Sequence, residues 1–459
     1  MTVLWWIRRD LRLSDNPTLL AALRHGGPVL PVFILDPHLL ERTPARRQAF
    51  LFGGLHALAA DLHERGGRLI IRRGPPEIIL FNLLTSAGAS AIYAETDFTP
   101  YARTRDERIA QTLPLTLVDG QTVHTPAALR KADGAPYTVF TPFSRAWKAL
   151  LPPDLTPLPA PPYFPPAPLL RSEELPGLPP PHGFPAGERE AGRRLEHFLS
   201  TPIDQYDSAR NRLDLEGTSA LSPYLRFGML SMRQAASVAL RARPGSGADT
   251  WLNELIWREF YINILYHFPH VSRTAFNPTL AQIAWRDNLE DFEAWKAGRT
   301  GLPVVDAAMR QLALTGWMHN RARMIAASFL VKDLLINWQW GERWFMENLL
   351  DGDPAANNGG WQWTAGTGTD AAPYFRIFNP VLQSQKFDPL GAYIRRWVPE
   401  LASLPTPAIH APWEAGLRVP GYPERPIVDR SLARDRALAA YQNSRWLSTG
   451  GQEKTPVPV

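Results

Sequence analysis

Residues 151–186 contain 14 prolines in 36 positions, in runs such as PAPPYFPPAP and LPPPHG. Proline lacks a backbone N–H donor and has a fixed φ, so this segment can form neither a helix nor a central strand. The composition predicts an extended connector between two domains, spanning residues 126–189 in all. Tyr163, Phe164 and Phe184 indicate that the connector packs on a domain, although a disordered tether would have a similar composition.

Before the connector, residues 1–125 alternate short apolar runs with segments of helical composition. The expected strands are VLWWI (3–7), PVLPVFIL (28–35), RLIIRR (68–73), AIYAE (91–95) and LTLVD (115–119). This order predicts a Rossmann-like α/β domain, in which helices cover both faces of a parallel sheet. No GxGxxG motif follows the first strand, and DLRLSDNP (10–17) lies instead at the strand end where such sheets bind ligands.

From residue 190 the pattern becomes helical. Apolar residues recur at three- and four-residue spacing in stretches such as VDAAMRQLALTGWMHNRARMIAASFLVKDLLINW. We expect residues 190–459 to form a large all-α domain. Of the 16 tryptophans, 13 lie in this part of the chain, which indicates that the two halves have different functions.

The composition excludes several classes of protein. The chain has no cysteine, which excludes disulfides, thiolate metal sites and a cysteine nucleophile. Its 11 histidines show no HExxH or paired metal-ligand spacing, so no metal is expected. The net charge of +5 modestly favours a polyanionic partner. No stretch of 18 apolar residues and no signal-peptide pattern is present, so we expect a cytoplasmic protein that does not span a membrane.

Two motifs could bind a ligand in the helical part. GTSALSPYL (217–225) places hydroxyl groups before a predicted helix start, which suits a phosphate or pyrophosphate, although a plain Ser/Thr cap is about three times as common. WLNELIWREFY (251–261) places Trp251, Glu254 and Arg258 on one helical stripe with Trp257 nearby. A carboxylate between indoles can bind the edge of a base, and a buried helix with a Glu–Arg pair is the alternative.

A third motif, DGDPAANNGGWQWTAGTGTD (351–370), combines small residues with two tryptophans. Small residues let the backbone approach a flat ligand, Asn and Asp offer hydrogen bonds, and Trp361 and Trp363 add aromatic faces. The alternative is a Gly-rich loop beside a core tryptophan. TGWMHNRARM (315–324) places Asn320, Arg323 and Met324 within two helical turns, and these residues are expected to face that segment.

Taken together, these motifs resemble the photolyase–cryptochrome family, and most closely its class I cyclobutane pyrimidine dimer photolyases. The resemblance runs from WWIRRDLRLSDNPTLLAAL to QKFDPLGAYIRRWVPEL (385–401) and is densest in GWMHNRARM, SFLVKDLLINW and DGDPAANNGGWQWTAGTGTDAAPYFRIFNP. It implies an antenna-type domain over residues 1–125 and a domain over residues 190–459 that binds FAD and DNA.

The resemblance implies that FAD binds in the helical domain and is active as reduced FADH⁻. The residues at the family's FAD positions are Tyr206, Thr218, Ser219, Ala220, Leu221, Ser222, Trp251, Arg258, Asn320, Arg323, Asp351, Asp353 and Asn357. Asn357 falls beside flavin N5. Plant cryptochromes have Asp in the similar motif, so Asn357 favours repair over signalling.

The resemblance also implies a DNA substrate. Glu254, Trp257, Met324 and Trp363 match positions that line the pocket for the flipped dimer, and Arg210, Arg321, Arg376 and Lys386 match positions that contact DNA phosphates. Photolyases are a standard example of base flipping, and a damaged pair costs less to flip than an intact one. Stacking on Trp257 and Trp363 offsets about 1–3 kcal/mol per base.

The implied activity is that of a carbon–carbon lyase driven by light. Excited FADH⁻ passes an electron to the cyclobutane dimer, two ring bonds break and the electron returns. Glu254 could hydrogen-bond the dimer carbonyls if it is protonated. Trp361, Trp338 and Trp285 match an electron path that ends at the surface, and Trp295 is the alternative end.

Three alternative functions remain open. A cryptochrome-type photoreceptor is the first, and a (6-4) photolyase, which carries two histidines where this chain has Asn320 and Met324, is the second. The third is a flavin electron-transfer enzyme unrelated to DNA.

The resemblance also bears on the antenna chromophore and on the binding partners. Tyr101-Ala102 replaces the Asn-Glu pair of folate-binding members, so a deazaflavin or second flavin is favoured as the antenna chromophore, and members without an antenna are similar here. We expect a monomer that binds UV-damaged DNA and needs no protein partner.

Overall fold

The structure is a computed structural model that describes residues 1–152, 154–200, 202–242 and 245–448. The chain divides into two compact units. Unit 1 consists of Met1–Ser208, Gly217–His267 and Leu350–Asp353. Unit 2 consists of Ala209–Glu216, Phe268–Leu349 and the described residues from Pro354 on. Neither unit is a continuous piece of the sequence.

Unit 1 contains a parallel sheet in the order β3-β2-β1-β4-β5. Its strands are β1 (Thr2–Ile7), β2 (Val29–Leu35), β3 (Ile70–Arg73), β4 (Ala89–Glu95) and β5 (Leu115–Val118). In the centre of the sheet, Trp5 lies opposite Pro31 on one side and Tyr93 on the other. β1 and β2 are buried along their whole length, which explains their continuous apolar sequences. The predicted parallel sheet is confirmed.

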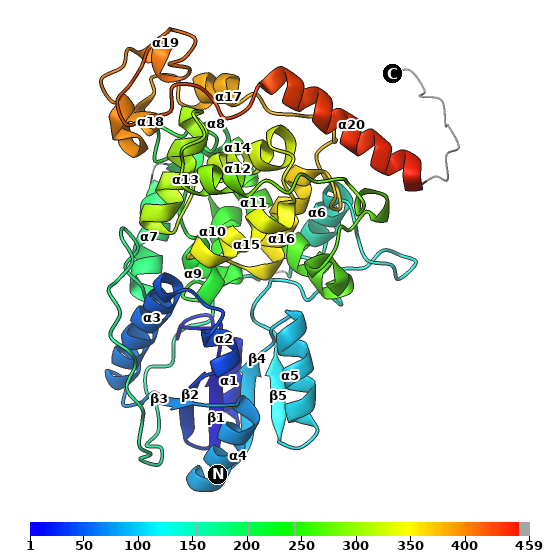
Figure 1. Ribbon diagram of the computed structural model, residues 1–459. Helices are drawn as coiled ribbons and strands as arrows, with labels where there is room; N and C mark the ends of the chain where they lie inside the picture. The colour runs from blue at the N-terminus through cyan, green and yellow to red at the C-terminus, as the bar shows by residue number, and fades with distance from the viewer. Residues whose placement is uncertain (153, 201, 243–244, 449–459) are drawn as a thin grey trace. The chain divides into compact units, whose positions relative to one another are not determined.

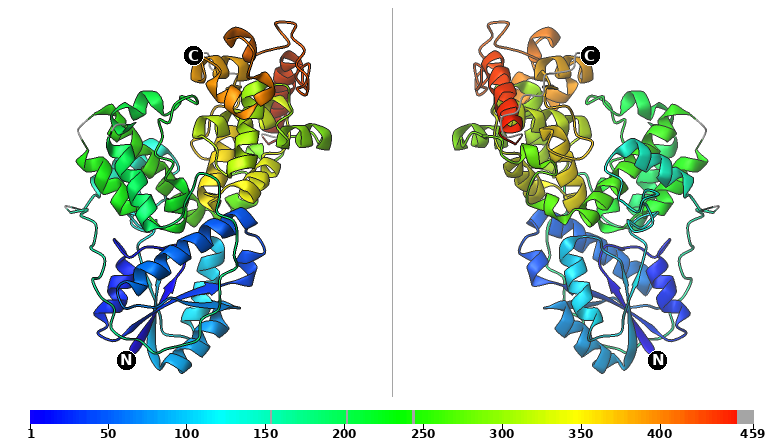
Figure 2. Two further views of the ribbon diagram at one scale, coloured as in Figure 1. Left: turned by 90° about the vertical axis from the view of Figure 1, so that its left-hand side faces the viewer. Right: turned by 90° about the vertical axis from the view of Figure 1, so that its right-hand side faces the viewer.

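Helices cover both faces of this sheet (Figures 1 and 2). They are α1 (Pro17–Arg24), α2 (Pro37–Leu40), α3 (Ala45–His63), α4 (Pro76–Ala87) and α5 (Pro100–Ala110). Asn16 caps α1 by accepting a hydrogen bond from the Leu19 N–H at 2.9 Å. α4 ends at Gly88, whose φ of 54° is in the left-handed region that glycine adopts without strain. Local signals thus set the helix ends, and the buried sheet sets the packing.

The rest of unit 1 is helical. Its elements are α6 (Phe140–Ala149), α7 (Glu188–Ser200), η1 (Pro202–Gln205), α8 (Tyr206–Ala209), which ends in unit 2, α9 (Ser222–Phe227), α10 (Met232–Arg241) and α11 (Ser246–His267). α10 begins with a reciprocal capping box between Ser231 and Gln234. α6 falls inside the range expected for the connector. The helix forms there because its sequence FTPFSRAWKA is amphipathic and buries Phe143 and Trp147.

The proline-rich connector packs along the edge of the sheet. Its described residues between 151 and 186 form neither helix nor strand. Ile71 of β3 donates its N–H to Ser172 Oγ at 2.9 Å and accepts the N–H of Glu173 at 3.1 Å. Phe164 and Phe184 are buried, whereas Tyr163 is exposed. The connector therefore covers the open edge of β3, which would otherwise present unpaired backbone groups.

Unit 2 is helical, and no strand follows β5 in the described part of the chain. Its α-helices are α12 (Leu289–Lys296), α13 (Pro303–Thr315), α14 (Asn320–Ser328), α15 (Trp338–Asn348), α16 (Pro354–Ala365), α17 (Pro380–Phe387), α18 (Ala392–Trp397), α19 (Thr406–Ile409) and α20 (Arg430–Ser448). Shorter elements are the 3-10 helices η2 (Pro269–Ser272), η3 (Pro278–Leu280) and η5 (Pro399–Leu401) and the π-helix η4 (Phe329–Asp333). None of the described helices combines the length and the apolar character needed to span a membrane.

The Asn- and Gly-rich segment that precedes WQW is helical and is not a loop. α16 begins at Pro354, runs through Gly359 and Gly360, and buries Trp361 in the core of unit 2. Proline is well tolerated in the first turn of a helix, and packing of the buried face outweighs the low helix propensity of the two glycines. The residues of this motif therefore have fixed positions on a helix.

Candidate cofactor and DNA sites

The predicted site residues are divided between the two units. Unit 1 carries Tyr206, Thr218, Ser219, Ala220, Leu221, Ser222, Trp251, Glu254, Trp257, Arg258, Asp351 and Asp353. Unit 2 carries Arg210, Trp285, Asn320, Arg321, Arg323, Met324, Trp338, Asn357, Trp361, Trp363, Arg376 and Lys386. Within the described residues, no group of three or more His, Asp and Glu side chains could hold a metal ion.

In unit 1, Asp353 lies among arginines. Its carboxylate, 2 % exposed, is 2.5 Å from the Arg9 guanidinium and 3.7 Å from those of Arg226 and Arg258. Burial opposes the charge on Arg9, but the carboxylates of Asp353 and Asp97 outweigh it and raise the Arg9 pKa. Burial lowers the Arg226 pKa to about 9. This cluster is rich in positive charge, and no motif in the sequence places Arg9 or Arg226 in it.

Arg258 has a free donor within this cluster. Burial lowers its pKa, and its Nε has no hydrogen-bond partner among the described residues. Its Nη2 donates weakly to the Leu225 carbonyl of α9 at 3.4 Å. A buried guanidinium donor without an acceptor suits an anionic ligand.

The segment before α9 has no side-chain cap. The N-cap residue is Leu221, which makes no side-chain capping bond, and Ala220 has a φ of 49°. The Ser/Thr cap considered as an alternative is therefore not formed at the N-cap. Ser222 is the first residue of the helix.

α11 carries the predicted stripe of unit 1. Trp251 is buried against Phe198, with ring centroids 5.0 Å apart, and Phe198 also meets the edge of Tyr206 at 5.6 Å. Glu254 and Trp257 are half-buried. Arg258 forms its ion pair with Asp353. The predicted helix is confirmed.

In unit 2, Asn357 lies on α16 beside Glu342 of α15. Asn357 Nδ2 donates to the Glu342 carbonyl at 3.0 Å, and Asn358 Nδ2 donates to the Glu342 carboxyl at 3.0 Å. Burial raises the pKa of Glu342 to about 7. Gly360, one turn after Asn357, would place a Cβ where no atom lies within 4 Å. A flat ligand could therefore approach the backbone of α16 closely.

Three of the predicted DNA contacts influence one another electrostatically. Burial, followed by repulsion from Arg210 and Arg376, lowers the pKa of Arg321 to about 10. We call Arg210, Arg321 and Arg376 the arginine group. Arg321 donates to Asn211 Oδ1 at 2.6 Å and lies 4.5 Å over the Phe387 ring, which Lys386 also approaches at 5.4 Å.

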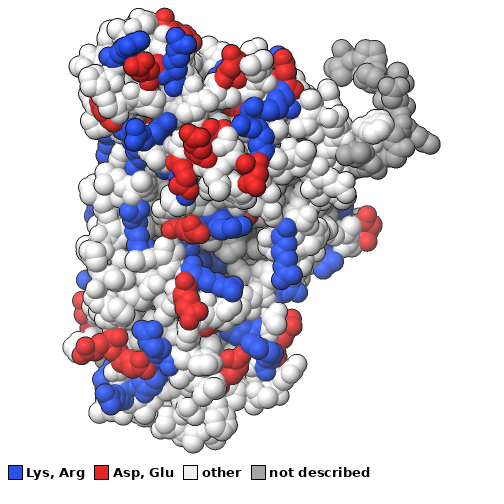
Figure 3. All heavy atoms as spheres, in the orientation of Figure 1, with Lys and Arg blue, Asp and Glu red and all other residues white. Residues whose placement is uncertain are grey.

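The other predicted residues of unit 2 are less enclosed. Asn320 is exposed and Met324 half-buried on α14, with Asn320 Nδ2 3.9 Å from Met324 Sδ. Arg323 Nε donates to the Met318 carbonyl at 2.8 Å, and Trp363 is half-buried. On the face shown in Figure 3, Lys and Arg side chains are interspersed with Asp and Glu, so the positive charge is not gathered in one broad patch there.

The tryptophans of the predicted electron path belong to the core of unit 2. Trp361 and Trp338 are each 3 % exposed. Trp285 is half-buried and meets the edge of Tyr441 at 6.1 Å. Trp295 is completely buried, donates to the Ala326 carbonyl at 3.0 Å and meets the edge of Trp361 at 6.2 Å.

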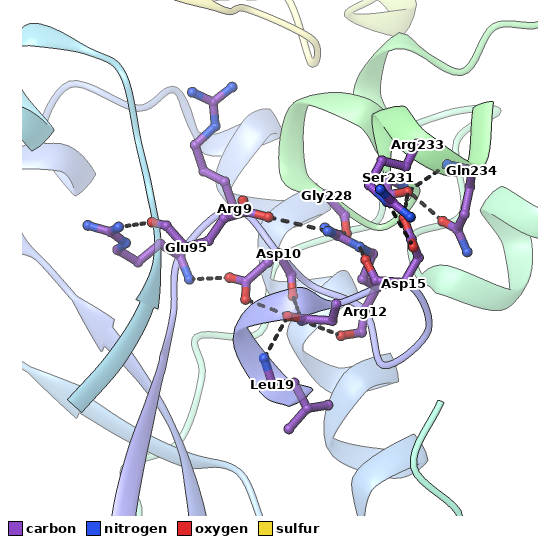
Figure 4. A network of polar contacts seen from close by, with 12 residues as sticks. Arg9, Asp10, Arg12, Asp15, Leu19, Glu95, Gly228, Ser231, Arg233 and Gln234 are labelled. Carbon is purple, nitrogen blue, oxygen red and sulfur yellow. Dashed lines mark hydrogen bonds and ion pairs between the residues drawn. The ribbon is translucent and has the colours of Figure 1, made fainter. Parts of the chain in front are cut away.

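The segment after β1 forms an internal network (Figure 4). Arg12 donates to the Asp15 and Gly228 carbonyls, both at 3.1 Å, and pairs with Glu95 at 3.3 Å. Asp15 in turn accepts from Ser231 and pairs with Arg233 at 3.4 Å. The polar groups of DLRLSDNP thus join the sheet to the α9–α10 region within unit 1.

A second aromatic and charged group lies on α2, α5 and β1. Tyr101 stacks on His38 at 4.6 Å and donates to Asp36 at 2.5 Å, and burial raises its pKa to about 12. The Arg8 and Arg105 guanidiniums lie over the Trp6 ring at 4.8 and 4.7 Å, and both form ion pairs with Asp106. The exposed His38 and half-buried Tyr101 rings offer aromatic faces within the α/β domain, whereas Trp6 is buried and its neighbouring cations are paired with Asp106.

Two family models match the chain. The one described as DNA photolyase matches residues 3–163, and the one described as the FAD binding domain of DNA photolyase matches residues 251–443. A deoxyribodipyrimidine photo-lyase from Agrobacterium fabrum is 41 % identical, and the alignment covers 96 % of this chain and 97 % of that protein.

Two solved structures are also similar. A bacterial class III photolyase from Agrobacterium tumefaciens has a TM-score of 0.91 at 39 % identity, covering 97 % of this chain and 98 % of that one. An archaeal photolyase from Sulfolobus tokodaii with two FAD molecules, described as implying a novel light-harvesting cofactor, has a TM-score of 0.83 at 32 % identity, covering 96 % and 100 %.

Proposed function

The chain belongs to the photolyase–cryptochrome family, and from that premise we propose that it is a deoxyribodipyrimidine photo-lyase, which uses light to split cyclobutane pyrimidine dimers in DNA. The observation that carries this proposal is the 41 % identity to such an enzyme over nearly the full length of both chains. Within the family, the sequence motifs resemble class I, whereas the similar Agrobacterium tumefaciens structure is described as class III.

Each unit, taken separately, has residues whose chemistry suits FAD. In unit 1, the buried Arg258 Nε has no acceptor among the described residues, which suits a pyrophosphate, and the nearby arginines add positive charge. In unit 2, the open space at Gly360 and the amide of Asn357 suit a flat, polar ring. When bound and reduced, FAD supplies the light-driven electron that splits the dimer.

The protein's own residues bind and orient the DNA. The arginine group contributes sequence-independent affinity for phosphates, because Lys and Arg release counterions when they bind DNA. Trp257 and Trp363 provide faces on which the flipped bases stack. Glu254 and Met324 complete the proposed pocket. Glu254 would position the dimer by a hydrogen bond when it is protonated, and Met324 would add a soft apolar contact.

We assign Trp361, Trp338 and Trp285 to an electron path that re-reduces the cofactor. The half-buried Trp285 suits the surface end, whereas the complete burial of Trp295 argues against that role. In photoreduction of oxidised cofactor with an external reductant, Trp285→Phe should lose at least about tenfold in rate. Trp295→Phe is the matched control and should retain most of the rate, and the reverse result would assign the end to Trp295.

We propose that the α/β domain accepts a deazaflavin or a second flavin as an antenna, in preference to folate. The Sulfolobus tokodaii structure with two FAD molecules supports this choice. The stacked Tyr101 and His38 supply aromatic contacts in this domain. A ratio of one flavin per chain in the purified protein, with no other chromophore in its absorption spectrum, would remove the antenna from the proposal.

Repair can be measured directly. The reduced protein is illuminated with an oligonucleotide that contains one cyclobutane thymine dimer, and the return of thymine absorbance is followed. Asn357→Asp replaces the donor to the Glu342 carbonyl by a carboxylate, so the repair rate at saturating DNA should fall at least about tenfold while DNA affinity is kept. Bound FAD without repair of this lesion or of a (6-4) lesion would favour a cryptochrome-type photoreceptor, and repair of the (6-4) lesion alone would favour that photolyase.

A further inference from the structure

Trp257 is held against a second aromatic ring. Phe140, the first residue of α6, lies parallel to the indole with a centroid separation of 3.8 Å and an interplanar angle of 3°. Aromatic pairs in proteins are usually found with centroids about 4.5–7 Å apart. The two rings are therefore in close face-to-face contact, and protein covers one face of Trp257.

Phe140 is itself fixed by the packing of α6 on α11. Phe260 of α11 presents its edge to Phe140 at 6.0 Å and to Trp257 at 5.5 Å. Phe143, one turn along α6, is completely buried and contacts Phe260 at 5.2 Å. The α6 helix is thus anchored through the same aromatic cluster that holds the Trp257 ring.

Polar contacts add a second anchor between the two helices. Trp147 of α6 is completely buried and donates its indole N–H to the Glu259 carboxyl of α11 at 2.6 Å. Ser144 donates to Asn253 at 3.4 Å. Separation of α6 from α11 would require these contacts to break, so the backbone that carries Phe140 is fixed against α11 in unit 1.

The stack has two consequences for a ligand of Trp257. A base can stack only on the face that Phe140 does not occupy, so the direction of approach is determined. The close contact also restricts rotation of the indole, and a side chain that is already ordered loses less entropy when a ligand binds. Both effects favour a base that has left the DNA helix over one that remains stacked inside it.

We propose that Phe140 is a positioning residue for the flipped pyrimidine dimer, which it serves by holding the Trp257 indole as a rigid stacking surface. The inference rests on the proposed function, because it takes Trp257 as the residue that stacks on the dimer. Phe140 lies at the start of α6, before the proline-rich stretch and outside the segments matched to substrate contacts. A part of the chain expected to act as a connector therefore determines selectivity for damaged DNA.

The test compares Phe140→Leu with Phe140→Tyr in the FAD-containing protein. Leucine keeps apolar volume but has no flat ring, whereas tyrosine keeps the ring. The measurement is the dissociation constant for an oligonucleotide with one thymine dimer and for the same oligonucleotide without damage. Phe140→Leu should weaken dimer binding about 3- to 10-fold and leave undamaged binding unchanged, and Phe140→Tyr should restore dimer binding to within about twofold.

Two further variants distinguish a wrong role for Phe140 from a wrong assignment of Trp257. Phe98→Leu is the matched control, because Phe98 is buried against Tyr266 of the same helix α11, at 5.8 Å, away from Trp257. It should leave the ratio of the two dissociation constants unchanged. If Trp257→Ala weakens dimer binding but Phe140→Leu does not, or if tyrosine fails to restore binding, the role of Phe140 is overturned. If Trp257→Ala itself binds the dimer normally, the assignment of Trp257 fails and the inference fails with it.

Discussion

At the scale of single residues, the arginines of this protein differ in their surroundings. Arg321 has a half-buried side chain that is held by Asn211 and Phe387, and its pKa is lowered to about 10 by burial and by Arg210 and Arg376. Arg310 of the same unit instead forms an ion pair with Glu400 at 2.7 Å. Neighbouring arginines repel one another, which lowers their pKa values, and a bound phosphate reduces this repulsion. The electrostatic environment of Arg321 therefore suits a phosphate, whereas the charge of Arg310 is paired with Glu400.

Arg321→Gln should weaken binding to damaged and undamaged DNA about equally. A lost phosphate contact also reduces the slope of log K against log salt concentration by about 1. Titrations of a labelled duplex at several salt concentrations measure this slope. Arg310→Gln is the control and should leave the slope unchanged. An Arg321→Gln slope equal to that of the unsubstituted protein would remove Arg321 from the DNA surface.

At the scale of elements, the pair α15–α16 joins Glu342 to two neighbouring amides. Burial raises the pKa of Glu342 from 4.5 to about 7. Between these two values the folded chain holds a proton that the unfolded chain has lost. The stability contributed by this group is thus complete below about pH 4.5 and is lost as the pH rises towards 7.

Glu342→Gln should remove this dependence. The free energy of unfolding of the variant, relative to that of the unsubstituted protein, should rise by ~2 kcal/mol between pH 5 and pH 8. Urea unfolding at both pH values gives the comparison. Glu347→Gln, which changes an exposed carboxyl on the same helix, should show no such pH-dependent difference. A constant difference for Glu342→Gln would mean that the carboxyl is ionised throughout this range.

The elements also show what the sequence can predict. The five strands begin and end within two residues of their predicted runs. Continuous burial explains the continuous apolar runs of β1 and β2, whereas β5 is only partly buried. α16 was expected as a ligand-enclosing segment or a loop, because Asn and Gly disfavour helices in isolation and the burial of Trp361 is not visible in the sequence. The stacking of Phe140 on Trp257 depends on the packing of two helices more than 100 positions apart in the chain, and no local pattern predicts it.

At the scale of the whole molecule, an ion pair between distant parts of the sequence completes unit 1. Arg9 follows β1, and Asp353 precedes α16, 344 positions later. The Asp353 side chain is buried and that of Arg9 is 10 % exposed, and removal of one partner of a buried pair typically costs about 3–5 kcal/mol. Sequence motifs placed Asp353 at the cofactor site, but the partnership with Arg9 follows only from the tertiary structure.

A double-mutant cycle tests this pair. Arg9→Met and Asp353→Asn should each lower the free energy of unfolding, and the double variant should lose less than the sum of the two, with a coupling energy of about 1–3 kcal/mol. Urea unfolding of the four proteins with a fixed excess of FAD gives the cycle. Additive losses would show that the Arg9–Asp353 contact contributes nothing to stability.

The discontinuity of unit 1 has a consequence for synthesis. Its sheet is encoded in the first 118 residues, but its last stretch, Leu350–Asp353, emerges from the ribosome only after about half of unit 2 has been made. Domains commonly fold in order during translation, N-terminal first. The Arg9 guanidinium therefore lacks its Asp353 partner until about three quarters of the chain has been synthesised. A nascent chain stalled before residue 350 would therefore carry a formed sheet beside a cluster of arginines that lacks the Asp353 carboxylate.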